Sequence, residues 1–384
     1  MPHALHTATE DATAWLLGHA CPLWFGVGID AGGGYPHDQL DAALLPATDY
    51  VRTRVVARQI YSVLKCRTLA GDADKWQPVL AGLKRYLLRE CRNEDGTFCF
   101  QSWPLVGRRD AVVDNYDQAF ALYALALLNA AEPDATLKGY AQGLLHRLHE
   151  VRGAEPYGFH ENDERSGNLL TNPHMHMFEA LLAWAESDAD GIWRHELDRL
   201  AALFFERLYN AGNGFVTECF DTGWVPAAGA RGDVVEPGHQ FEWATLMDRY
   251  FTLTGDARLD LGDFYRRALK AGVPNGGRFV FSAVNTEGRC TDARARLWPH
   301  TEWLKAALMM ARRDTDNRAA YEADALSAWQ GLKAFLDHDV AGLWYDWRTP
   351  DGRFTHEPAR ASSMYHIVGA IEAMVAYQSR GGER

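Results

Sequence analysis

The polar residues best suited to proton transfer stand at the beginnings of apolar, helix-like segments. In the run EPGHQFEWATL, His239 and Glu242 are three residues apart and therefore share one face of a predicted helix. A histidine beside a carboxylate can act as a general acid or base near neutral pH. The alternative is structural, with Glu242 capping the helix and His239 an ordinary polar residue near a loop.

Three more clusters occupy comparable places. In LLTNPHMHMFEALLAW, Asn172 and a proline begin a helix on which His176 and Glu179 share a face. His174 points about 200° away from His176, so the two cannot serve one small site. Helix capping or packing explains any one of these clusters taken alone. The remaining clusters are Trp298, His300 and Glu302 in RLWPHTEWLKA, and Tyr365 and His366 in SSMYHIVGAIEAM.

An arginine pair adds positive charge to the candidates. The segment YVRTRVVARQIYSVLK places Arg54 and Arg58 four residues apart on one helix face. An arginine in a pocket could stabilise a developing enolate oxygen or hold a substrate hydroxyl group. A structural salt bridge is the alternative for each residue, and the spacing alone does not choose between them.

The elements that must position these residues follow a weak internal repeat. A glycine followed by an aromatic residue recurs roughly every 62 residues, within short strand-like stretches such as GTFCF and GRFVFS. The interval between two copies is long enough for a pair of helices. The copies are Gly34 with Tyr35, Gly96 with Phe98, Gly158 with Phe159, Gly214 with Phe215, Gly277 with Phe279, and Gly342 with Trp344.

The two helices of an interval differ in character. Residues 116–130 are apolar nearly all round, which predicts a buried inner helix, whereas residues 135–150 have one charged face, which predicts an outer helix. Six such hairpins predict an all-α (α/α)6 barrel with short glycine-aromatic loops, a single domain over residues 1–384. An open helical solenoid is the alternative, but it would show a tighter consensus and polar capping units. Inner and outer segments alternate again in 175–185 and 193–208, 242–254 and 259–271, and 302–312 and 319–336.

Composition and charge restrict the class of protein. Of 384 residues, 47% are hydrophobic and 23% charged, which excludes a mainly disordered chain. A net charge of −12 without a basic patch argues against a nucleic-acid partner. No stretch of about 18 apolar residues could span a membrane, and the N-terminus lacks the pattern of a signal peptide, so we expect a cytoplasmic protein.

Cofactor and metal motifs are not found in the sequence. Phosphate-binding glycine loops, HExxH and G-x-S-x-G are missing, the histidines lack ligand spacing, and the six cysteines form no CxxC pair. We therefore expect no cofactor, no metal and reduced thiols. A glycoside hydrolase would need two opposed carboxylates, and Asp114, Asp117, Glu242 and Glu302 keep that alternative open.

Taken together, the clusters resemble those of a known family. RTRVVARQIYS, DNYDQAF, TNPHMHMFEA, PGHQFEWATLM, WPHTEWLKA and YHIVGAIEAM are similar to segments of the N-acylglucosamine 2-epimerase superfamily, and the resemblance runs from about residue 15 to residue 378. The form PGH-x-FEW resembles the branch that contains D-mannose isomerase and related aldose-ketose isomerases. The resemblance implies an (α/α)6 barrel and metal-free proton transfer on a sugar.

The resemblance also implies roles for individual residues. His239 and His366 would be the catalytic acid and base on the two sides of the sugar, with Glu242 orienting His239 or sharing its proton. Trp298 would form part of the wall. The nearby Arg231 and Glu236 align with no defined position. The residues expected to hold the hydroxyl groups and the carbonyl oxygen are Arg54, Tyr116, Asn172, His176, Glu242 and Glu302.

The implied reaction converts an aldose into a ketose through a cis-enediolate. D-mannose and D-fructose are the expected pair, followed by D-lyxose and D-xylulose. The alternatives are 2-epimerisation of an N-acylglucosamine or a disaccharide, glycoside hydrolysis, and a sugar-binding protein that has lost the chemistry. We expect a monosaccharide as the partner of a monomer or homodimer, with no nucleic acid and no membrane.

Overall fold

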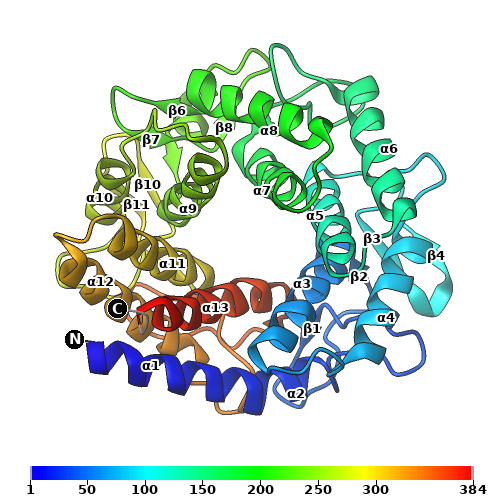
Figure 1. Ribbon diagram of the computed structural model, residues 1–384, viewed down its shortest axis with the longest axis horizontal. Helices are drawn as coiled ribbons and strands as arrows, with labels where there is room; N and C mark the ends of the chain where they lie inside the picture. Colours follow the sequence, from blue (N-terminus) through cyan, green and yellow to red (C-terminus); the bar gives the residue numbers. More distant parts are fainter. Residues whose placement is uncertain (1, 382–384) are drawn as a thin grey trace.

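The computed structural model describes residues 2–381 and shows two concentric rings of helices (Figure 1). This arrangement confirms the predicted (α/α)6 barrel. Helices α7, α9 and α11 begin about one turn before the apolar segments 175–185, 242–254 and 302–312, because the polar, proline-containing clusters ahead of those segments form the first helical turns. The inner helices are α3 (Thr53–Leu69), α5 (Asn115–Ala131), α7 (Thr171–Ser187), α9 (Pro237–Thr254), α11 (Leu297–Arg313) and α13 (Met364–Gly381), the last preceded by a 3₁₀ turn, Ala361–Ser363.

The outer ring covers the apolar backs of the inner helices. Trp193 of α8, for example, stacks on Trp184 of α7 with ring centroids 4.3 Å apart. Helix α1 packs against α12 and α13, so both rings close on themselves. None of the helices between residues 2 and 381 is long and apolar enough to cross a membrane. The outer helices are α1 (Pro2–Trp15), α2 (Cys21–Trp24), α4 (Gln77–Tyr86), α6 (Ala135–Arg152), α8 (Gly191–Leu203), α10 (Leu261–Gly272) and α12 (Arg318–Leu336), with π-helical turns at Leu16–Ala20, Leu87–Cys91 and Phe204–Leu208.

At the end of the barrel where the inner helices begin, short antiparallel strands join every unit except that of α5 to the next one. Strands β2, β5, β9, β12 and β14 precede inner helices and pair with β3, β8, β10, β13 and β1 of the following glycine-aromatic region. The pair of β14 with β1, in which Arg360 lies opposite Gln39, joins the last unit to the first. The barrel is therefore closed, and the open solenoid is excluded.

The strands have two or three residues each, and further 3₁₀ turns lie at Pro104–Val106 and Gly229–Asp233. The strands are β1 (Gln39–Leu40), β2 (Val51–Arg52), β3 (Gln101–Trp103), β4 (Arg108–Arg109), β5 (Leu169–Leu170), β6 (Tyr209–Asn210), β7 (Phe215–Val216), β8 (Cys219–Phe220), β9 (Val234–Val235), β10 (Ala283–Asn285), β11 (Cys290–Asp292), β12 (Ala295–Arg296), β13 (Trp347–Arg348) and β14 (Ala359–Arg360).

The fourth residue of two inner helices is a glutamine that holds a glycine-aromatic loop. Gln118 accepts a hydrogen bond from the backbone N of Phe98 at 2.8 Å and donates one to the carbonyl of Phe98 at 2.8 Å. Gln240 makes the same pair with Val216, at 3.0 and 2.9 Å. A buried loop amide is satisfied in each case, which explains why the loops recur with the helices.

A histidine replaces the glutamine in two other units. Nε2 of His174 accepts from the backbone N of Phe159 at 2.9 Å, and Nε2 of His300 accepts from that of Val280 at 3.1 Å. The Nδ1 atom of each ring donates to a carbonyl one turn earlier, at 2.7 and 2.8 Å. Gly158 lets the loop come this close, since a Cβ there would lie 2.9 Å from Nε2 of His174. Both histidines are therefore structural.

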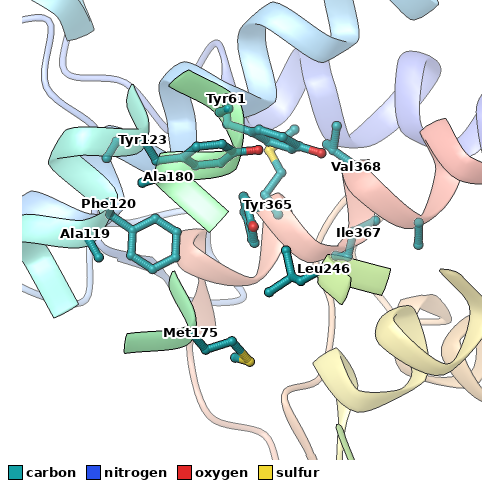
Figure 2. Packing of buried hydrophobic residues seen from close by; sticks show 14 of the residues in the cluster. Tyr61, Ala119, Phe120, Tyr123, Met175, Ala180, Leu246, Tyr365, Ile367 and Val368 are labelled. Atoms are coloured by element: carbon teal, nitrogen blue, oxygen red, sulfur yellow. The ribbon is translucent and has the colours of Figure 1, made fainter. Parts of the chain in front are cut away.

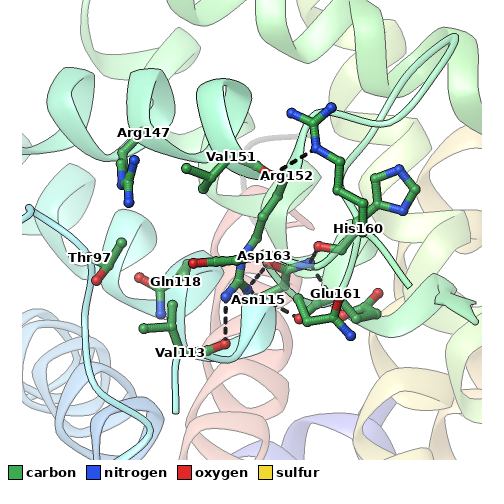
Figure 3. A network of polar contacts seen from close by, with 12 residues as sticks. Thr97, Val113, Asn115, Gln118, Arg147, Val151, Arg152, His160, Glu161 and Asp163 are labelled. Atoms are coloured by element: carbon green, nitrogen blue, oxygen red, sulfur yellow. Dashed lines mark hydrogen bonds and ion pairs between the residues drawn. The ribbon is translucent and has the colours of Figure 1, made fainter. Parts of the chain in front are cut away.

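Side chains, rather than a strand, hold the beginning of α5. Arg152 at the end of α6 donates to the carbonyl of Val113 at 2.9 Å, to Oδ1 of Asn115 at 2.8 Å and to Oδ1 of Asp163 at 2.6 Å (Figure 3). The Arg152 side chain is only 4% exposed. The loop after α6 is thereby fixed to the first turn of α5, next to Tyr116.

Candidate active site

The sixth residue of every inner helix belongs to one layer across the barrel. Phe120 contacts the guanidinium of Arg58 at 4.3 Å and the ring of His176 at 4.6 Å. A carboxylate oxygen of Glu242 lies within 4.8 Å of a ring nitrogen of His176. Glu242 lies equally close to Glu302 and His366, its neighbours in the layer on the other side. Counted from the first helical residue, and from Ala361 for the last helix, the six are Arg58, Phe120, His176, Glu242, Glu302 and His366.

A cavity of about 110 Å³ is bounded by four members of this layer and by the rim of the barrel. Seven of the nine predicted site residues line it, namely His239, His366, Tyr116, Asn172, His176, Glu242 and Trp298. Glu302 lies directly behind His366, and Arg54 lies outside the lining. The other lining residues are Arg58, Glu236, Arg296, Asp346, Trp347, Arg360, Ser362 and Ser363.

The indole of Trp298 separates the two predicted catalytic histidines. Its ring centroid lies 5.0 Å from that of His239 and 5.6 Å from that of His366, with tilts of 32° and 34°. Gly238 makes this packing possible, because a Cβ at that position would lie 2.5 Å from the indole. The structure therefore brings both histidines to one cavity from α9 and α13.

His239 is surrounded by carboxylates. Its Nδ1 atom lies 3.0 Å from Oε2 of Glu218 and 4.0 Å from Oε2 of Glu236. Burial alone would lower the pKa of His239, but the charges of Glu218 and Glu236 raise it to about 10. The imidazole is thus a cation at neutral pH, and Glu218, not the predicted Glu242, is the closest carboxylate to it. Glu218 was missed because it comes from a separate loop between β7 and β8.

His366 has the opposite protonation state. Its Nδ1 donates to Oε1 of Glu302 at 2.8 Å, which leaves Nε2 as the free nitrogen of the ring. Burial lowers the pKa of His366 to about 3, despite the neighbouring carboxylate. Burial would raise the pKa of Glu302, but Lys305, at 2.5 Å from its Oε2, and His366 hold it low. His366 is therefore a neutral imidazole beside an ionised carboxylate.

Glu242 is a protonated carboxyl group between two carboxylates. Burial and the charges of Glu302 and Glu179 raise its pKa well above the ordinary range. The side chain is buried, and Oε1 has no hydrogen-bond partner among the described residues. A neutral carboxyl group here can both donate to and accept from a hydroxyl group in the cavity.

A second histidine-carboxylate pair forms the neighbouring wall. Nδ1 of His176 lies 3.0 Å from Oε2 of Glu179, as the predicted shared face required, and Tyr365 donates to the other carboxylate oxygen. Burial lowers the pKa of His176 to about 4. Tyr365 in turn packs against the rings of Tyr61 and Tyr123 (Figure 2). The polar wall of the cavity therefore rests on a buried aromatic cluster.

The structure differs from the prediction for Arg54. Its guanidinium binds Asp117 at 2.5 Å and Asp114 at 3.2 Å, outside the cavity lining. Burial raises the pKa of Asp117 to about 6 even with this partner, which shows how much the carboxylate depends on the ion pair. Arg54 is the second residue of α3, at the rim, where the chain uses it as a structural salt bridge.

Arg58 occupies the place expected for Arg54. It is 6% exposed, donates to the hydroxyl of Tyr116 at 2.6 Å and to the carbonyl of Ser362 at 3.2 Å, and lines the cavity. Its guanidinium also stacks over Phe120 and Tyr365. These contacts fix the cation, and its Nε has no partner among the described residues.

The rim of the cavity carries further polar residues, of which Arg296, Asp346 and Arg360 were not among the candidates from the sequence. Arg296 lies 3.7 Å from Glu236, and the backbone N of Arg360 donates to Asp346 at 3.2 Å. Asn172 faces the same cavity with its Oδ1 unpartnered among residues 2–381. Arg231 is exposed and does not line the cavity. The rim thus offers both charges and a free amide oxygen to a ligand.

Two triplets have donor atoms close enough for one metal ion, His176 with Glu179 and Glu242, and Glu242 with Glu302 and His366. In both, the histidine nitrogen nearest the carboxylate is already hydrogen-bonded to it. The ammonium group of Lys305 also neutralises Glu302. The two histidine–carboxylate pairs are therefore hydrogen-bonded, whereas Glu242, which belongs to both triplets, keeps an oxygen without a partner among the described residues. That no metal is needed stays a prediction from the sequence.

Comparison with known proteins agrees with this architecture. A D-mannose isomerase of known structure has a TM-score of 0.80 at 17% identity, with 97% of each chain covered. Cellobiose 2-epimerase from Bacillus thermoamylovorans B4167 has a TM-score of 0.84 at 16% identity, covering 97% of this chain and all of that one. At these identities the likeness establishes the fold.

Sequence comparison reaches further. A protein of Rhizobium meliloti (strain 1021) named mannose-6-phosphate isomerase is 36% identical over 377 residues, with 96% of each chain covered. The sequence profile of N-acylglucosamine 2-epimerase (GlcNAc 2-epimerase) matches residues 33–370. The chain therefore belongs to the N-acylglucosamine 2-epimerase family of sugar isomerases and epimerases.

Proposed function

We propose that this protein is an aldose-ketose isomerase that converts D-mannose into D-fructose, with D-lyxose as a second substrate. The observation that carries the proposal is the pair of buried histidines, His239 and His366, which border one cavity on the two sides of Trp298. Each contacts a carboxylate, Glu218 at 3.0 Å and Glu302 at 2.8 Å, and the opposite directions of their pKa shifts support different roles. The family membership and the mannose isomerase fold support the same class of reaction.

In this reaction His366 exchanges protons with the carbon atoms of the sugar, and His239 exchanges protons with its oxygen atoms. After ring opening, Nε2 of His366 takes the proton from C2 of the aldose, while His239 donates a proton to the carbonyl oxygen at C1. Arg58 stabilises the negative charge that develops on the C1 oxygen before its protonation by His239 is complete. His366 then returns its proton to C1 and His239 recovers one from the oxygen at C2, which gives the ketose and restores both side chains.

The unequal histidines favour isomerisation over epimerisation. Epimerisation at C2 needs a group on the second face of the sugar that exchanges a proton with carbon. His239 has a pKa of about 10 because of its carboxylate neighbours, which suits an acid that exchanges protons with oxygen. Isomerisation needs only one carbon base, the neutral His366. The cavity of about 110 Å³ is also small compared with the roughly 300–1000 Å³ of pockets for larger ligands, which favours a monosaccharide over a disaccharide.

A phosphorylated mannose is the second candidate substrate. The relative from Rhizobium meliloti carries the name mannose-6-phosphate isomerase, and Arg296 and Arg360 stand at the rim of the cavity. Against a phosphate subsite, both arginines already have carboxylate neighbours, Glu236 at 3.7 Å and Glu357 at 3.5 Å. We therefore place the free sugar first.

The test is to incubate chelator-treated protein in heavy water with D-mannose, mannose 6-phosphate, N-acetylglucosamine and cellobiose in separate samples and to follow each by NMR. The proposal expects fructose with deuterium at C1, formed without added metal. A 2-epimer from any sample, or conversion only after a divalent metal is restored, would overturn it. The His366→Gln variant is the control and should give neither product nor exchange at C2.

A further inference from the structure

Lys305 reaches the catalytic layer from one turn below it on α11. Its Nζ lies 2.5 Å from Oε2 of Glu302, whose other oxygen accepts the Nδ1 proton of His366 at 2.8 Å. The Glu302 side chain has no exposed surface, so its charge needs a partner inside the protein. One carboxylate thus links an ammonium group to the imidazole that borders the cavity.

The position of the negative charge decides what His366 can do. Glu242 and Glu302 lie within 4.8 Å of each other in a buried layer, where two adjacent carboxyl groups do not both ionise readily. If Glu302 carries the charge, it accepts the Nδ1 proton and leaves the lone pair on Nε2. If Glu302 is protonated, its hydroxyl donates to Nδ1 and the imidazole proton moves to Nε2, so the ring can no longer take a proton from the sugar.

We propose that Lys305 is a positioning residue that holds the charge on Glu302 and so fixes the tautomer of His366 with its free nitrogen at Nε2. Lys305 does not line the cavity and acts only through Glu302. The inference rests on the proposed function only for the part played by His366 as the base.

The charged and titratable groups around this position come from four inner helices. Glu179 of α7 adds negative charge, and Glu242 of α9 is the carboxyl group that competes with Glu302 for the charge. Arg58 of α3 and His366 of α13 complete the surroundings. Among the described residues, Lys305 is the only lysine that forms an ion pair with a member of the layer, Glu302. Its removal therefore leaves Glu302 without its nearest cation.

Lys305→Met tests the inference, with Lys305→Arg as the charge-preserving variant. Lys65→Met is the matched control, because Lys65 also projects from an inner helix and pairs with a carboxylate, Glu372, at 2.7 Å, but has no contact with the catalytic layer. We expect Lys305→Met to lower kcat by about 100-fold or more with KM changed less than about 3-fold. Lys305→Arg should recover most of the rate, and Lys65→Met should match the wild type.

The tautomer itself is read by ¹⁵N NMR of histidine-labelled protein, with the His366 signals identified by their loss in His366→Gln. In the wild type the imine-type shift should belong to Nε2, and in Lys305→Met to Nδ1. An unchanged tautomer in Lys305→Met overturns the inference, whether or not the rate falls. This readout needs no substrate, so a wild-type protein that fails on every sugar would overturn the proposed function and leave the tautomer result intact.

Discussion

Nδ1 of His239 lies 3.0 Å from Oε2 of Glu218, which reaches the first turn of α9 from the loop between β7 and β8. His239 is buried and Glu218 is partly buried, with 13% of its side chain exposed, and no lysine or arginine side chain of the described residues lies within 4.0 Å of Glu218. His366 also contacts a carboxylate, but that carboxylate is shared with Lys305. The pKa values of the two histidines proposed to be catalytic therefore shift in opposite directions, and their carboxylates differ in what else they bind.

Glu218→Gln should lower the pKa of His239 and so narrow the pH range in which His239 is protonated and can act as an acid. The pKa of about 10 means that the imidazolium persists at neutral pH and is lost only as the pH rises through that value. Without Glu218 the pKa of His239 is raised only by the more distant Glu236 and by Glu242, so the alkaline limb of kcat should move to lower pH by about one unit or more. The measurement is the pH profile of kcat.

Glu196→Gln is the control for this change, because Glu196 makes a similar 2.7 Å contact with His149 outside the cavity. Its profile should match that of the wild type. An alkaline limb that stays in place in Glu218→Gln would contradict the assignment of His239 as the acid.

Arg58→Met and Arg54→Met should have opposite consequences. Arg58 lines the cavity, so its loss should reduce kcat by about 10²-fold to 10³-fold. Arg54 pairs with the fully buried Asp117, so its loss should reduce the free energy of unfolding by about 3–5 kcal/mol while the folded fraction keeps most of its activity. Urea unfolding and kcat measured on both variants check the pair. Equal losses of activity would mean that Arg54 also acts in the site.

The barrel could be predicted from the sequence because its repeat appears in two independent signals, the apolar inner helices and the glycine-aromatic loops. Closure was an inference, which the pairing of Gln39 with Arg360 confirms. Most of the site also followed from the clusters at the helix starts, since His239, His366 and Trp298 do meet at one cavity.

The sequence favours Arg54 as a substrate-binding residue, whereas the structure places Arg58 in the cavity lining. The helical segment predicted around them spans residues 50–65 without a defined first helical residue, so the equivalence of Arg58 with His176 and His366, each the sixth residue, cannot be seen from the sequence. Lys305 stood in the sequence three residues after Glu302, a spacing that predicts contact on a helix. Glu218 had no such signal, because its contact depends on tertiary structure.

Removing one loop contact should cost stability and spare catalysis. His300→Ala leaves the backbone N of Val280 buried without a partner, which should lower the free energy of unfolding by about 1–3 kcal/mol. His300 does not line the cavity, so kcat per folded molecule should stay near the wild-type value. Denaturant unfolding and active-site titration check this. A large fall in kcat at full folding would show that the loop positions the cavity wall.

Glu242→Gln and Glu302→Gln separate the neutral carboxyl group from the ionised one. Burial and neighbouring carboxylates raise the pKa of Glu242 well above its ordinary range, so an amide is close to its working state and should keep most of kcat. Glu302 is ionised and holds the Nδ1 proton of His366, so an amide there removes the charge that keeps Nε2 basic and should reduce kcat by about 10²-fold or more. Because both changes are isosteric and occur in one buried layer, differences in packing are small. If Glu242→Gln proved the more damaging, the charge would reside on Glu242, and the pairing of His366 with an ionised Glu302 would be wrong.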